Sequence, residues 1–274
     1  MESRKYSIDA DFLEHQGRNL FHLLLRPTDG ATRGSILFLP PFAEEMHKSR
    51  GVVASQARRF AAQGYNVLLL DLTGCGDSSG DFADASWQLW REDAIAGVDR
   101  LSSISDAPLT LWGLRMGALL ACDLAVRLSR LVQLVLWQPV LNGEQHLDQF
   151  LRMRTVLTGL GDGEQFDRKS LWGELRAGRS LEIAGYELSP RMALEMARVR
   201  LHDLHPSCEV SWYEIGHSIG AGLGVASANV VRAWRGQGVK VTASEVPGEP
   251  FWRVSEEGIN PALEDATLKN MQSA

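Results

Sequence analysis

Short apolar runs alternate along the first half of the chain with segments of helical periodicity. The apolar runs end at turn residues and occupy residues 35–39, 65–70, 109–112 and 131–137. The segments between them carry their apolar residues at helical spacing and span 48–64, 87–101 and 118–128. This alternation is typical of a mostly parallel sheet flanked by helices. We also predict an opening antiparallel pair over residues 20–25.

The alternation breaks between about Gly143 and Pro206. Three helix-like pieces appear there, and the last begins at Ser189-Pro190, an N-cap followed by proline in the first turn. The sheet pattern then resumes with a strand at 209–215, a helix at 225–236 and a strand at 239–246. A polar stretch from 256 is predicted to form a terminal helix. We therefore predict a core formed by residues 1–142 and 207–274, with residues 143–206 inserted over the sheet as a helical cap.

The composition argues against a small domain held together by disulfides or metal ions. A chain of 274 residues can bury a large core without disulfide or metal staples. The three cysteines lack metal-ligand spacing, and the glycine-rich loop 71–80 lacks the spacing of a dinucleotide motif, so we expect no metal and no cofactor.

Charge and hydropathy limit the kinds of partner that we expect for the protein. The net charge of -6 gives no basic surplus for nucleic acid. No segment approaches the roughly 18 uninterrupted apolar residues of a membrane span. We expect a cytoplasmic protein whose partner is a small molecule, while the oligomeric state stays open.

A tight turn, Gly113-Leu-Arg-Met-Gly117, joins a predicted strand to an apolar helix. This is the setting of the nucleophile elbow of α/β-hydrolases, whose motif is Gly-x-Ser-x-Gly. Pro40-Pro41, the loop 71–80 and the segment 246–252 follow other strands in the order of that fold. Over nearly its whole length the chain resembles α/β-hydrolases. The resemblance implies a mostly parallel central sheet flanked by helices, with a helical cap insertion.

Four segments are more narrowly similar to one family, the exosortase A system-associated hydrolase 2 family. They lie at residues 40–50, 112–117, 136–139 with 143–145, and 247–252. The resemblance implies a bacterial protein associated with an exosortase and PEP-CTERM sorting system and with exopolysaccharide production. The hydrolase label of that family comes from its superfamily.

The Ser-His-Asp triad of the superfamily is not intact in this sequence. Arg115 occupies the serine position, and a guanidinium stays protonated, so it cannot attack a carbonyl as a nucleophile. After the last strand, Glu249 or Pro250 occupies the histidine position. The usual place of the acid offers Glu214, with His217 just beyond, and whether these two side chains face the pocket stays open.

Arg115 needs a partner, because a cation at a helix N-terminus is opposed by the helix dipole. In one interpretation, Arg115 and the N–H groups of the elbow bind a carboxylate, a phosphate or a developing oxyanion. In the other, an ion pair with Glu44 or Glu45 seals a decayed site. Because a buried, unpaired arginine is strongly destabilising, we expect at least one of these glutamates to contact Arg115 in either case.

The leading hypothesis is a hydrolase acting on a small acyl, ester or thioester compound. Arg115 would anchor the substrate, and Glu44, Glu45 or His47 would activate water without an acyl-enzyme. The alternatives are a surface, helix-capping role for His47 and a surrogate nucleophile at Cys75. A different class of function is a non-catalytic protein that binds an anionic ligand or a partner protein. We expect the substrate-binding residues beside the elbow and at strand ends: Phe42, Leu114, Met116, Gln138 and Trp252.

Overall fold

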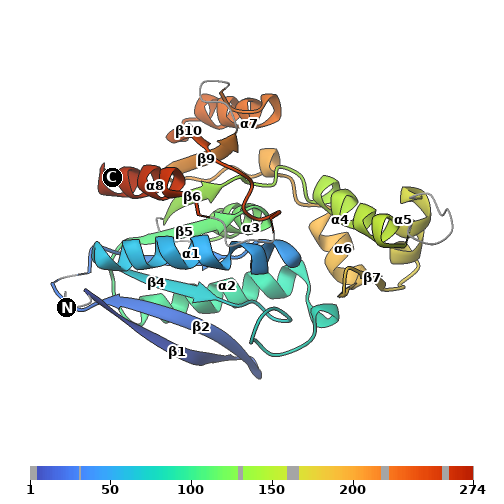
Figure 1. The fold of residues 1–274 in the computed structure, drawn as a ribbon, viewed down its shortest axis with the longest axis horizontal. Coiled ribbons are helices and arrows are strands. Elements are labelled where there is room, and N and C mark those ends of the chain that lie inside the picture. Colours follow the sequence, from blue (N-terminus) through green and yellow to red (C-terminus); the bar gives the residue numbers. More distant parts are fainter. Residues whose placement is uncertain are drawn as a thin grey trace.

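A computed structural model describes residues 5–30, 32–128, 132–158, 167–216, 222–254 and 259–273. These residues form an eight-stranded sheet covered by helices, with a two-stranded sheet at one end (Figure 1). Along the large sheet, the strands follow in the order β1 (Tyr6–His15), β2 (Arg18–Pro27), β4 (Tyr65–Leu70), β3 (Gly34–Leu39), β5 (Leu109–Leu114), β6 (Val132–Trp137), β9 (Val210–Gly216) and β10 (Val241–Pro247).

Most neighbours in this sheet are parallel, as the sequence predicts. The exceptions are the β1–β2 hairpin and the pairing of β2 with β4, which are antiparallel. Residues 20–25 form the middle of β2, and their hairpin partner is β1. Every residue of β3 and β5 is buried, because helices cover both faces of these strands.

Each face of the sheet has its own apolar core. On one face, α1 (Glu44–Ala62) and α8 (Pro261–Ser273) pack over residues such as Trp112 and Trp137. The other face is covered by α2 (Trp87–Ser102), α3 (Met116–Ala125) and α7 (Val225–Gly236). The helix α1 begins at Glu44 rather than at Lys48, because Ala43 at its N-cap adopts φ 52° and turns the chain after Pro40-Pro41. Two candidate acids therefore lie in the first turn of a helix.

The segment between β6 and β9, which we call the insertion (residues 143–206), contains the three predicted helices. They are α4 (Gly143–Thr158), α5 (Arg168–Arg176) and α6 (Pro190–Met196). The sequence did not predict the antiparallel pair β7 (Leu181–Ile183) and β8 (Tyr186–Leu188) between α5 and α6. In Figure 1 the insertion lies at one end of the sheet, away from the chain termini.

The insertion shares a continuous apolar core with α2 and α3. Met192 and Met196 of α6 belong to the same buried cluster as Trp87 and Trp90 of α2. Two single-turn helices, η1 (Phe82–Asp84) and η2 (Leu201–Asp203), lie at this junction, where β8 packs against η1. Among the described helices, none has the length and apolar character needed to cross a bilayer.

Candidate active site

The strand β5 passes into α3 through a strained turn at Arg115. This residue has φ 55° and ψ -114°, a conformation that is costly for a residue with a side chain. Its N–H donates to the carbonyl oxygen of Trp137 at 2.9 Å. A Cβ atom on Gly117 would overlap the carbonyl of Leu39, and one on Gly113 would overlap the backbone of α3. Only glycine fits both flanks, so the geometry of a nucleophile elbow is present around an arginine.

The Arg115 guanidinium forms a two-pronged ion pair with Glu45. Its Nε–H lies 3.2 Å from Glu45 Oε1 and 3.3 Å from Oε2, and its Nη2–H donates to Oε1 at 3.1 Å. Both side chains are only 11% exposed. The guanidinium carbon also lies 5.3 Å from the centre of the Trp252 ring. The expected contact of Arg115 with one of the two glutamates is therefore confirmed for Glu45.

Burial dominates the ionisation of Glu45. It raises the pKa of the Glu45 carboxyl, although the neighbouring Arg115 charge opposes the change. A guanidinium has five N–H donors, and Glu45 occupies the Nε–H and one Nη2–H. The Nη1–H groups and the second Nη2–H are not used by this carboxylate. The pair thus leaves part of the hydrogen-bonding capacity of Arg115 for another acceptor.

A cavity of about 250 Å³ lies beside this pair. The start of α1, the helix α4 and the segment after β10 surround it, and its lining consists of Phe42, Glu44, Glu45, Lys48, His146, Gln149, Phe150, Met153, Trp252 and Arg253. Arg115 is not part of the lining, but it contacts two residues that are, Glu45 and Trp252.

Three buried polar atoms of the lining have no hydrogen-bond partner among the described residues. They are Glu44 Oε2, His146 Nδ1 and Trp252 Nε1. Burial, together with the charges of Arg115 and Arg253, lowers the pKa of His146 to about 3, so this imidazole is neutral at physiological pH. Most buried polar groups in proteins are paired, so three unpaired atoms around one cavity suggest a polar ligand.

The cavity brings together five of the residues singled out in the sequence: Phe42, Glu44, Glu45, Trp252 and, through its partners, Arg115. The others lie elsewhere. His47 is exposed on α1, outside the lining. Leu114 and Met116 are buried in the two cores, with 0% and 1% exposure. Their proposed roles in the site stay predictions.

Gln138 and Glu214 bond to the backbone near the ends of the strands. Gln138 Oε1 accepts a hydrogen bond from the N–H of Ile215 at 2.7 Å, which links β6 to β9. Glu214 Oε2 accepts one from the N–H of Gly224 at 2.9 Å. Neither side chain lines the cavity described above, and the substrate-binding role of Gln138 stays a prediction. His217 lies outside the described residues.

The Cys75 thiol has the wrong ionisation for a nucleophile. Burial and the nearby carboxylates of Asp71 and Asp93 raise its pKa to about 12, so it stays protonated near neutral pH. Burial likewise raises the pKa of Cys208 to about 12 and keeps that of Cys122 well above its ordinary value. No group of three or more potential metal-ligating side chains occurs in the described part of the chain.

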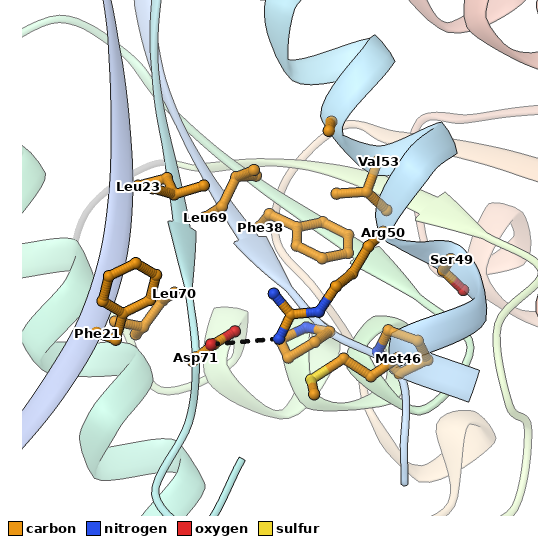
Figure 2. Close-up of a pocket in the computed structure, with 13 residues that line it drawn as sticks. Phe21, Leu23, Phe38, Met46, Ser49, Arg50, Val53, Leu69, Leu70 and Asp71 are labelled. Atoms are coloured by element: carbon orange, nitrogen blue, oxygen red, sulfur yellow. Dashed lines mark hydrogen bonds and ion pairs between the residues drawn. The ribbon is translucent and has the colours of Figure 1, made fainter. Parts of the chain in front are cut away.

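A second cavity, of about 100 Å³, lies between α1 and the strands β2, β3 and β4 (Figure 2). Figure 2 shows Arg50 reaching from α1 toward Asp71, to which it is paired at 3.4 Å. The remaining lining is mostly carbon, and the Ser49 hydroxyl donates to the carbonyl of Glu45. The lining of this cavity includes neither Arg115 nor Glu45, so we place the candidate active site in the cavity beside the Arg115–Glu45 pair.

Comparisons with known proteins identify the fold around this site. A family model described as Hydrolase_4 (serine aminopeptidase, S33) matches residues 31–166. Est1E from Butyrivibrio proteoclasticus, solved with ferulic acid, aligns with a TM-score of 0.65 at 15% identity, over 95% of this chain and 99% of that chain. The chain has the α/β-hydrolase fold. The fold class predicted from the sequence is thus confirmed.

Other solved structures share the fold. A thermostable carboxyl esterase from Bacillus coagulans aligns with a TM-score of 0.65 at 15% identity, over 99% of each chain. A thioesterase domain from the curacin biosynthetic pathway aligns with a TM-score of 0.55 at 17% identity, over 98% of this chain and 100% of that domain. No curated protein sequence matches the chain significantly. The family match and these structures together support the α/β-hydrolase superfamily.

Proposed function

We propose that this α/β-hydrolase-fold protein hydrolyses a small acyl, ester or thioester compound without forming an acyl-enzyme. The observation that carries the proposal is the Arg115 guanidinium, held by Glu45 at the elbow and flanked by a cavity that contains a second carboxylate, Glu44. The elbow is where this fold presents its reacting group to the substrate. An arginine there can stabilise negative charge even though it cannot attack a carbonyl.

Glu44 is the better choice of general base among the three candidates. Arg115 binds both oxygens of Glu45, and His47 is exposed outside the cavity. Glu44 lines the cavity, and its Oε2 is buried without a hydrogen-bond partner among the described residues. A carboxylate oxygen in this position can accept a proton from a water molecule that enters with the substrate.

The proposed reaction has two steps. Glu44 takes a proton from water while the water oxygen bonds to the substrate carbonyl carbon, and N–H groups of Arg115 that Glu45 does not use stabilise the resulting oxyanion. When this intermediate collapses, the bond to the alcohol or thiol breaks, and the leaving group takes the proton back from Glu44. The products are a carboxylic acid and an alcohol or thiol. General acid–base catalysis by one side chain typically contributes about 10²–10⁴-fold.

A second candidate function is ligand binding without turnover. It is favoured by one observation: Glu45 already pairs with Arg115, and Arg115 itself does not line the cavity. In that case the same cavity would hold an anionic ligand, or the protein would bind a partner.

Steady-state hydrolysis of 4-nitrophenyl acetate and of an acetyl thioester by the full chain tests the proposal. We expect turnover above background that falls at least about 100-fold in Glu44→Gln and in Arg115→Met. Glu14→Gln is the matched control, because Glu14 is an exposed glutamate on β1, far from the cavity lining. Absence of turnover, or equal turnover in all three variants, would contradict hydrolysis at this site.

The wider setting of the activity is proposed from sequence resemblance alone. We propose that the protein acts in the bacterial cytoplasm, in the context of an exosortase and PEP-CTERM system and of exopolysaccharide production. We further propose that the insertion acts as a cap over a core formed by residues 1–142 and 207–274. The position of His146, Gln149 and Phe150 in the cavity lining supports this role, since all three come from α4.

A further inference from the structure

We infer that the cavity takes a substrate carrying a carboxylate or phosphate group, which Lys48 and Arg253 bind away from the reacting carbonyl. This inference rests on the proposed function, because it names the substrate class of the same site. Neither Lys48 nor Arg253 was singled out in the sequence. The structure brings them together from α1 and from the segment after β10.

The charges around the cavity do not balance. Among the described lining residues, Glu45 is paired with Arg115, whereas Lys48 and Arg253 form no ion pair with any residue that the structure describes. Glu44 is the one remaining carboxylate of the lining. Two unpaired cations therefore face one unpaired anion, and a bound anionic group would balance the excess.

The charge of Arg253 influences groups that line the cavity even though its side chain is exposed. Its positive charge contributes to the lowered pKa of His146 and opposes the raised pKa of Glu45. The guanidinium is therefore within electrostatic reach of both α4 and the first turn of α1. An anion drawn to Arg253 would arrive at the mouth of the cavity rather than at a remote surface.

Buried donors extend the site inward. Trp252 is 4% exposed, and its Nε1–H has no acceptor among the described residues. His146 is 7% exposed, and its neutral ring can donate or accept a hydrogen bond at the unpaired Nδ1. Phe42 and Phe150 complete an aromatic wall, with ring centres 5.1 Å apart. The volume of about 250 Å³ is below the roughly 300–1,000 Å³ of typical ligand sites, so the ligand is small.

Isothermal titration of the full chain with hydrolysis-resistant amides tests the inference. The anionic probes are 4-acetamidobenzoate and 4-acetamidophenyl phosphate, and 4-acetamidobenzamide is the neutral isostere of the first. We expect the preferred anionic probe to bind at least about tenfold more tightly than the neutral one, through two partly exposed charge contacts. The ranking of the two anionic probes distinguishes a carboxylate substrate from a phosphate substrate.

Charge-neutralising variants locate the contact. Lys48→Gln and Arg253→Gln should each weaken binding of the preferred anionic probe about threefold to fivefold and leave binding of the neutral probe unchanged. Arg58→Gln is the matched control, because Arg58 is an exposed arginine of α1 that does not line the cavity. It should leave all three affinities unchanged.

The outcomes separate this inference from the proposed function. Equal affinities for the anionic and neutral probes, no measurable binding of the anionic probes, or an equal loss in Arg58→Gln would overturn the inference. Hydrolysis of neutral esters together with any of these results would leave the proposed function intact. Selective binding of an anionic probe without turnover of any ester would instead refute hydrolysis and keep the charged subsite.

Discussion

The ion pair between Arg115 and Glu45 leads us to predict that removing either partner lowers the free energy of unfolding, with a different pH dependence in the two cases. We consider Arg115→Met and Glu45→Met, which each leave one member of the pair buried without its partner. Methionine keeps an unbranched side chain at both positions, and at position 115 it leaves the strained backbone with φ 55° as it is. The comparison therefore isolates the loss of charge pairing.

The magnitude follows from burial. Both side chains are only 11% exposed, so the pair belongs with buried ion pairs rather than with surface pairs, whose contribution is about 0–1 kcal/mol. Removal of one partner from a buried pair costs about 3–5 kcal/mol. The double variant Arg115→Met/Glu45→Met leaves no unpaired charge. It should therefore unfold with a free energy within about 1–2 kcal/mol of the original protein.

The two single variants should differ in their dependence on pH. Without Arg115, the folded-state pKa of Glu45 lies further above its unfolded value, because burial already raises it. The cost of the buried charge is present above that folded pKa and is relieved as the pH falls through it, by at most about 1.4 kcal/mol per pH unit. Arg115 cannot lose its proton, so the deficit of Glu45→Met should not be relieved by acid.

Equilibrium unfolding in urea, followed by tryptophan fluorescence at pH 8 and pH 5.5, measures these differences. We expect the deficit of Arg115→Met relative to the original protein to shrink at pH 5.5, while that of Glu45→Met does not shrink. The reasoning is refuted if both variants lose less than about 1 kcal/mol at pH 8, or if their deficits change equally with pH.

Three further predictions concern the same region of the molecule. A fluorophosphonate probe should not label the elbow, and Arg115→Ser should not create an esterase, because Pro250 and its neighbours supply no histidine; labelling or a new activity would contradict this. His146 takes up a proton below about pH 6.5 in the unfolded state but only near pH 3 in the folded state, so the free energy of unfolding should fall as the pH falls between these values. The slope is at most about 1.4 kcal/mol per pH unit, and urea titrations should show a shallower slope for His146→Phe. Cys75 should resist iodoacetamide in the native protein at pH 8, as read by mass spectrometry, since its pKa is about 12.

The sequence predicted the sheet well because its strands are short apolar runs between turn residues. It missed the strands β7 and β8, which have three residues each and are too short to show a period. It also placed the start of α1 at Lys48. The positive φ of Ala43 begins the helix earlier, and no local signal marks an alanine for that conformation.

In the site, the sequence predicted the contact between Arg115 and Glu45 because two constraints agreed. The elbow motif fixed the position of the arginine, and the energetic cost of burying it required a nearby acid. His146 and Arg253 had no such signal. Their place at the cavity depends on how α4 and the segment after β10 fold back toward α1, which is a tertiary arrangement that no periodicity encodes. The one available hint to the role of His146 was its position, three residues after the start of the helix that follows β6.

The shared core between the insertion and α2 bears on how a ligand reaches the cavity. The Ser189 hydroxyl, before α6, donates to the carbonyl of Ala85, and Glu195, near the end of α6, accepts from the N–H of Gln88, so both ends of α6 are joined to the start of α2 by polar as well as apolar contacts. Swinging the insertion away as a hinged flap would break these bonds and hydrate a large apolar surface. The insertion and α2 are therefore packed as one unit, which disfavours ligand entry by a hinged opening of the insertion.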